Sequence, residues 1–229
     1  MNKVIILHGW TKNLDKWNDF LKNLDKTKID YEFPNIPGLT GNLNDVWNLD
    51  NYVNWLKKIT DRQKDKVILI GHSNGGRIAL AFANQHPEKV EKLILIDSAG
   101  IYHNELPLAL KRVIFKILAK LGKAFRNSST IKNAFYKLTG ENDYKDANPN
   151  MKQTMINLLN SDKLLRPKNI QVPTLIFWGK EDKIAPLSDG ILMNKLIKNS
   201  KLEIIKNARH SPMFTNAQEI ADIIIKEII

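Results

Sequence analysis

A serine stands at the centre of a glycine-flanked turn that directly follows an apolar run. The run spans residues 66–70, and Gly71, Ser73 and Gly75 then form the pattern G-x-S-x-G ahead of a segment with helical character. A turn from strand to helix of this kind exposes the serine hydroxyl, and the glycines let neighbouring backbone pass closely. The pattern predicts that Ser73 is a nucleophile. The alternative is a serine that only caps the start of the helix.

A serine hydroxyl becomes an effective nucleophile when a base takes its proton, and histidine is the usual base. His210 follows the last apolar run of the chain, in a short loop ahead of the terminal helical segment. In a parallel sheet flanked by helices, groups that act together gather beyond the carboxyl ends of the strands. This position favours His210 as the general base over a surface residue. The other histidines are His8, His72, His86 and His103.

An imidazole that acts as a base needs a carboxylate to fix its tautomer and stabilise its charged form. Asp182 follows the apolar run 174–178, and Asp97 directly follows the run 92–96. The chain order serine, aspartate, histidine favours Asp182, because enzymes with G-x-S-x-G carry their acid between the other two residues. Asp97 is the alternative acid. Each could instead be a solvated loop carboxylate.

Attack by a serine on a carbonyl group develops negative charge on the carbonyl oxygen, which backbone N–H groups can stabilise. The N–H of Asn74, directly after the serine, is one candidate donor. The loop after the first apolar run contains the other, for which the N–H of Trp10 is the best candidate. The Trp10 side chain could equally line a pocket or fill the core.

Short apolar runs alternate with amphipathic segments along most of the chain. This alternation predicts a doubly wound, mostly parallel sheet of about six strands with helices on both faces, in a single α/β domain over residues 1–229. The predicted strands are residues 3–7, 30–33, 66–70, 92–96, 174–178 and 202–205. The predicted helices are residues 15–24, 50–62, 74–86, 186–198 and 216–229.

The rhythm breaks in the middle of the chain, where a helical cap insertion is predicted at about residues 101–166. This segment has no strand-like run, and its apolar residues recur at helical spacing with lysine and arginine between them. It carries 12 Lys or Arg against 5 Asp or Glu, much of the formal net charge of +11. A lid over the pocket is favoured over contact with an anionic membrane surface. Nucleic acid is not expected as a partner, since no recognition motif accompanies the charge.

The composition excludes several chemistries. Cysteine is absent, so neither a disulfide nor a thiolate nucleophile nor a thiolate metal site can form. No spacing typical of metal ligands is present, and neither a metal nor a cofactor is expected. No apolar stretch approaches the roughly 20 residues that span a bilayer, and the first apolar run reads as a strand and not as a signal peptide. A cytoplasmic protein is therefore expected, with its oligomeric state open.

Together the motifs resemble the α/β-hydrolase superfamily over about residues 3–100 and 167–229. The motifs are His8-Gly9-Trp10, Pro37-Gly38-Leu39-Thr40-Gly41, the six residues 71–76, Trp178-Gly179-Lys180-Glu181-Asp182 and Ala208-Arg209-His210. The resemblance implies a catalytic triad of Ser73, Asp182 and His210, with the amides of Trp10 and Asn74 as the oxyanion hole. Two strands that usually precede the first run in that family are missing, which implies an exposed sheet edge.

Three functions are compatible with these residues. The leading hypothesis is a carboxylesterase that cleaves small or medium acyl esters through an acyl-enzyme intermediate. The second is a carbon–carbon bond hydrolase of the ring-cleavage type, which would use the same triad. The third is a ligand-binding protein that keeps the hydrolase fold without turnover. A serine at the nucleophile position argues against the dehalogenases and epoxide hydrolases that the resemblance would otherwise include.

Overall fold

The computed structural model describes residues 2–11, 13–27, 29–103 and 147–228. The chain divides into two compact units, Met1–Ile101 with Asp143–Ile229, and Tyr102–Asn142. Residues 104–146 of the predicted cap lie outside the described residues, whereas residues 147–166 are described.

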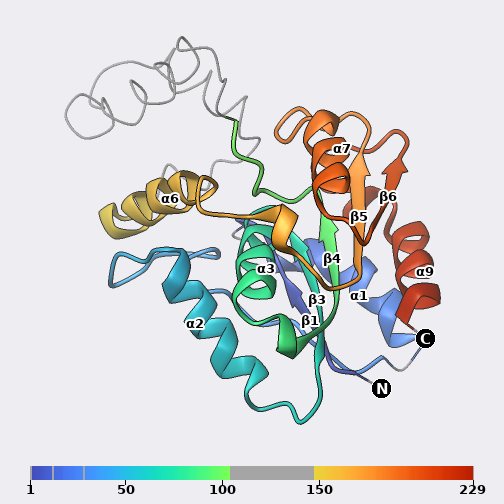
Figure 1. Cartoon of the computed structure of the whole chain (residues 1–229), viewed down its shortest axis with the longest axis horizontal. Helices are drawn as coiled ribbons and strands as arrows, with labels where there is room; N and C mark the ends of the chain where they lie inside the picture. The colour runs from blue at the N-terminus through green and yellow to red at the C-terminus, as the bar shows by residue number, and fades with distance from the viewer. Residues whose placement is uncertain (1, 12, 28, 104–146, 229) are drawn as a thin grey trace. The chain divides into compact units, whose positions relative to one another are not determined.

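The first unit is built on one parallel sheet of six strands (Figure 1). The strands are β1 (Val4–Leu7), β2 (Tyr31–Glu32), β3 (Val67–His72), β4 (Val90–Ile96), β5 (Thr174–Gly179) and β6 (Ser200–Ile205). Their order is β2-β1-β3-β4-β5-β6, so the chain runs outward from β1 to β2 and then returns to the other side of β1. The six-stranded parallel sheet is confirmed. The reversal of order between β1 and β3 marks the point where ligands bind in sheets of this kind.

The helices occupy the segments between the strands. They are α1 (Asn18–Asp25), α2 (Leu49–Thr60), α3 (Asn74–Gln85), α6 (Pro149–Ser161), α7 (Leu187–Leu196), α8 (Pro212–Thr215) and α9 (Ala217–Ile228). Short 3-10 turns cover Leu14–Trp17, Pro87–Lys89 and Pro167–Asn169. The single turn α8 was not expected from the sequence. It begins at Pro212, whose fixed φ suits the first position of a helix. None of the described helices has both the length and the apolar character needed to span a membrane.

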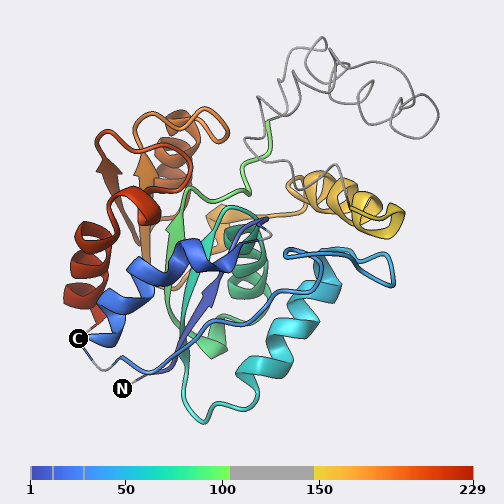
Figure 2. The same ribbon diagram turned by 180° about the vertical axis from the view of Figure 1, so that it is seen from behind.

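Each face of the sheet is covered by its own set of helices (Figures 1 and 2). Because successive side chains of a strand point to opposite faces, Ile5 and Leu7 of β1 pack in one apolar cluster and Val4 and Ile6 in another. The first cluster contains residues of α2, α3 and α7. The second contains residues of α1 and α9, which contact each other. The four central strands β1, β3, β4 and β5 are therefore buried on both faces of the sheet, as their uninterrupted apolar runs predicted, whereas the edge strands β2 and β6 are only partly buried.

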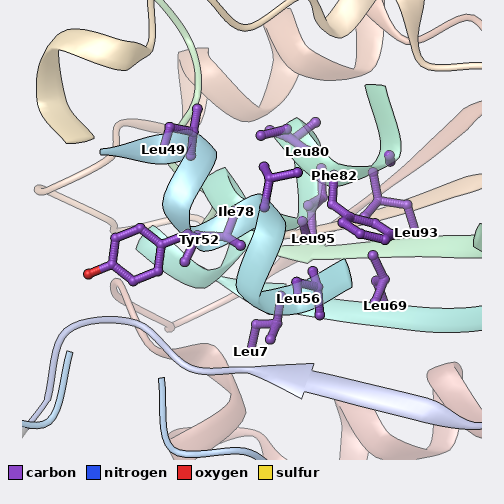
Figure 3. Close-up of a cluster of buried hydrophobic side chains, with 14 of the residues drawn as sticks. Leu7, Leu49, Tyr52, Leu56, Leu69, Ile78, Leu80, Phe82, Leu93 and Leu95 are labelled. Atoms are coloured by element: carbon purple, nitrogen blue, oxygen red, sulfur yellow. The ribbon is translucent and has the colours of Figure 1, made fainter. Parts of the chain in front are cut away.

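The first cluster fixes the helix that follows the predicted nucleophile. Ile78, Leu80 and Phe82 of α3 are fully buried between α2 and the sheet (Figure 3). Their partners include Tyr52 and Leu56 of α2 and Leu7, Leu69, Leu93 and Leu95 of the strands. Because interiors are close-packed, α3 has little freedom to shift along the sheet.

The turn from β3 to α3 has an unusual backbone. Ser73 adopts φ +52° and ψ −117°, in the region that residues other than glycine rarely occupy. The turn also approaches β1 closely, because a Cβ atom on Gly75 would lie 2.1 Å from the carbonyl oxygen of Leu7 and 2.5 Å from that of His8. The glycine after the serine is therefore required by the space available, as the sequence pattern indicated.

Replacing Gly75 by alanine should destabilise the protein strongly. The methyl group would overlap the Leu7 carbonyl, and backbone cannot move aside as a flexible side chain can. We expect the free energy of unfolding to fall by about 3 kcal/mol. Urea unfolding followed by circular dichroism measures the change. The matched control is Gly41→Ala, since a Cβ atom there meets nothing within 4 Å, and equal midpoints for the two variants would contradict the close approach.

Candidate active site

The structure brings three of the predicted site residues into one chain of hydrogen bonds. His210 Nε2 lies 3.0 Å from Ser73 Oγ, and His210 Nδ1 lies 2.7 Å from Asp182 Oδ2. Ser73 stands between β3 and α3, Asp182 in the loop after β5, and His210 in the loop between β6 and α8. All three loops leave carboxyl ends of parallel strands, so the sheet assembles residues that are far apart in sequence.

The Asp182 carboxylate is buried and held by backbone donors. Its Oδ1 accepts hydrogen bonds from the N–H groups of Ile184 (2.7 Å) and Ala185 (3.0 Å), which leaves Oδ2 facing the histidine. Since an ionised carboxylate only accepts, Nδ1 of His210 carries the proton of the neutral ring. The other nitrogen, Nε2, is then unprotonated and can accept the proton of the Ser73 hydroxyl.

The loops that present Asp182 and His210 are joined by backbone hydrogen bonds. The N–H of Glu181 donates to the carbonyl oxygen of Ala208, and that of Lys180 donates to the carbonyl oxygen of Ile205, both at 2.9 Å. This pairing continues the ladder between β5 and β6. The separation of the carboxylate and the imidazole is thereby set by main-chain geometry.

The loop after β1 lies directly against the serine. A Cβ atom on Gly9 would lie 3.0 Å from Ser73 Cβ. His8 braces the loop: its Nδ1 is 2.7 Å from the Gly9 carbonyl oxygen, and its Nε2 accepts from the N–H of Ile36 at 3.1 Å. These two bonds assign the proton to Nδ1, and burial lowers the pKa of His8. The loop that contains Trp10 therefore adjoins Ser73.

His72 is hydrogen-bonded to the backbone of the loop that contains His210. Its Nε2 lies 2.7 Å from the carbonyl oxygen of His210, and the two imidazole rings are 5.2 Å apart. Burial, reinforced by the nearby His210, lowers the pKa of His72 to about 3. His72 is therefore neutral, and its Nε2–H donates to the His210 carbonyl. The sequence placed His72 in the serine motif but gave no sign of this contact, which joins residues 138 positions apart.

Asp97, the alternative acid, lies beside Asp182 and not in its place. It is fully buried at the end of β4, and its Oδ1 accepts the N–H of Gly179 at 2.8 Å. Oxygens of Asp97 and Asp182 and a ring nitrogen of His210 lie within 4.8 Å of one another. Within the described part of the chain these three side chains form the only group that could hold a metal ion. Asp182 and His210 already bond to each other in that group.

An ion pair between the buried Arg77 and the partly buried Asp162 attaches the end of α6 to α3. Arg77 Nε and Nη2 bond to the two carboxylate oxygens of Asp162 at 2.7 and 3.0 Å, and Arg77 Nη1 contacts the Asn74 side chain. Asn148 caps α6 and donates to the carbonyl oxygen of Leu43 at 2.7 Å. The segment after residue 146 is thus held to the helix that follows Ser73. No pattern in the sequence indicated the ion pair.

The sheet order, the strained turn at Ser73 and the strand-end loops define an α/β-hydrolase. A family model described as serine aminopeptidase, S33, matches residues 2–216. The chain belongs to this family of α/β-hydrolases.

Known proteins similar to this chain include hydrolases of several kinds. It is 25% identical over 248 residues to monoacylglycerol lipase ABHD6 of Homo sapiens, with 97% of this chain and 74% of that protein covered. A protein of Acinetobacter baumannii AYE described as a lipase has a similar structure (TM-score 0.75, 24% identity, 99% and 83% covered). So does the meta-cleavage product hydrolase CumD of Pseudomonas fluorescens IP01 (TM-score 0.71, 18% identity, 99% and 90% covered).

His72→Gln should make the protein less sensitive to acid. Because the pKa of His72 is lowered from 6.5 to about 3 in the folded state, the unfolded chain binds one more proton between these values. Stability is therefore lost as pH falls through this window. Glutamine can still donate to the His210 carbonyl but does not titrate. Thermal unfolding at pH 7 and pH 4 should show a smaller drop in Tm for His72→Gln than for the wild type, with His86→Gln as control. An unchanged drop would contradict the assignment.

Proposed function

We propose that the chain is a serine carboxylesterase with Ser73 as nucleophile, His210 as general base and Asp182 as the acid that orients it. The continuous hydrogen-bond chain from the Ser73 hydroxyl through His210 to Asp182 is the observation that supports this most directly. A proton can pass along its first bond while the second stabilises the resulting imidazolium. Family membership and the similarity to a monoacylglycerol lipase support hydrolysis of an ester.

The proposed reaction has two steps. In the first, His210 Nε2 takes the Ser73 proton as Oγ attacks the ester carbonyl carbon. The resulting oxyanion accepts hydrogen bonds from the amides of Asn74 and Trp10, and His210 then protonates the departing alcohol. In the second step, His210 activates a water molecule that attacks the acyl-enzyme, and the carboxylic acid leaves Ser73.

The oxyanion hole in this proposal is supported by the packing around Ser73. The Asn74 amide opens α3 directly after the serine, and Gly9 brings the Trp10 loop against the Ser73 side chain. Each preset donor typically contributes about 10²- to 10³-fold to kcat. We further propose that small or medium acyl esters are the substrates.

Substitution of Ser73 or Asp182 should abolish most of the esterase activity. On p-nitrophenyl esters of increasing chain length, we expect Ser73→Ala to lower kcat by at least about 10⁴-fold and Asp182→Asn by about 10³- to 10⁴-fold. The reason is that the alanine has no hydroxyl to acylate, and the amide presents the wrong partner to His210 Nδ1. Steady-state kinetics and labelling of Ser73 by a fluorophosphonate probe measure these losses.

Matched controls are Ser188→Ala and Asp222→Asn, which change exposed residues outside the site. Both should retain wild-type rates. Wild-type protein that resists the probe and turns over no ester would favour the non-catalytic binding function. Hydrolysis of a ring-cleavage dienone in the absence of ester turnover would favour the carbon–carbon bond hydrolase.

A further inference from the structure

A second carboxyl group is buried behind the proposed acid. Asp97 is inaccessible to solvent and adopts φ +40°, directly after the end of β4. Its Oδ1 accepts the Gly179 N–H, but its Oδ2 is buried and accepts no hydrogen bond from the described residues. Its carboxyl group lies within 4.8 Å of an oxygen of Asp182 and a nitrogen of His210.

Two ionised carboxylates at this separation in a buried site would repel each other strongly. The negative charge is more stable on Asp182 than on Asp97, because Asp182 accepts hydrogen bonds from the Ile184 and Ala185 amides and from His210. Asp97 accepts from one amide only. Burial first, and the Asp182 charge second, raise the pKa of Asp97 to about 9. The proton therefore resides on Asp97.

We propose that Asp97 is a positioning residue that, as a neutral acid, donates its carboxyl proton to the Asp182 carboxylate and so holds Asp182 against His210. The proton turns the unpartnered Oδ2 of Asp97 into a donor, so the buried oxygen gains a partner. Asp182 then has a donor on each side, His210 in front and Asp97 behind. The inference rests on the proposed role of Asp182, and it assigns Asp97 a role different from that of an alternative acid.

The titratable groups that face Asp97 come from the two loops packed against it, Asp182 after β5 and His210 after β6. His72, behind His210, is neutral. Ionisation of Asp97 above about pH 9 would remove its donated hydrogen bond and place a second charge beside Asp182. In addition, the folded state holds one more proton than the unfolded chain between the usual pKa near 4 and the raised value. Stability is therefore lost as pH rises through this window.

Asp97→Asn tests the inference, because the amide can accept from Gly179 and donate to Asp182 but does not titrate. The rate of Ser73 labelling by a fluorophosphonate probe should fall only about two- to fivefold at pH 7. Between pH 8 and pH 10 the wild-type rate should fall about tenfold, while that of Asp97→Asn should not. The Tm of Asp97→Asn relative to the wild type should rise from pH 5 to pH 9. Asp222→Asn, an exposed carboxylate on α9, should behave as the wild type in both measurements.

Three results would overturn the inference. Loss of labelling in Asp97→Asn as large as that in Asp182→Asn would identify Asp97 as an ionised acid of the triad. An alkaline decline equal in Asp97→Asn and the wild type would show that Asp97 does not titrate there. A Tm difference independent of pH would show the same without any catalysis. If wild-type Ser73 is never labelled, the proposed function fails, and the Tm difference still decides whether Asp97 holds the proton.

Discussion

The left-handed backbone at Ser73 is the constraint on which the rest of the site depends. A residue at φ +52° is held there only when its surroundings leave no alternative, and here they do so from several directions. The Ser73 N–H donates to the Ile96 carbonyl at 3.2 Å, and its own carbonyl accepts from Ala99 at 3.1 Å. The close contact of Gly75 with β1 completes the enclosure. The position of the Ser73 hydroxyl is therefore fixed by the neighbouring strands β1 and β4 and by the tightly packed helix α3.

Electrostatics restrict the site as firmly as packing does. Two buried carboxyl groups, Asp97 and Asp182, lie close to His210, and the backbone amides of Ile184 and Ala185 donate hydrogen bonds to Asp182. A neutral His72 on the other side adds no positive charge that could compete for the carboxylate. The imidazole thus meets one anion in a fixed place, which determines the tautomer it needs to accept a proton from serine.

Much of this arrangement could be predicted from the sequence, because its signals are local. The apolar strands, the glycines around Ser73 and the histidine after the last strand each lie within a few consecutive residues. The sequence favoured Asp182 over Asp97 as the acid beside His210 but could not decide between them. Both residues follow strands that end at the same edge of the sheet. Which carboxyl group meets the imidazole depends on how the loops after β5 and β6 pair. The contacts of His72 with His210 and of Arg77 with Asp162 join residues 138 and 85 positions apart, and no local pattern encodes them.

Helix α6 and the two ends of the stretch before it are firmly attached to the first unit. The chain leaves the described part of the first unit after Ile101 and re-enters it at Ala147, and both residues are buried in the same apolar cluster. From there α6 is tied to α3 by the Arg77–Asp162 pair. An insertion, deletion or exchange confined to the residues between Ile101 and Ala147 would retain both buried ends and the Arg77–Asp162 pair. The helix that follows Ser73 is therefore braced from both sides of a long interruption in the chain of the first unit.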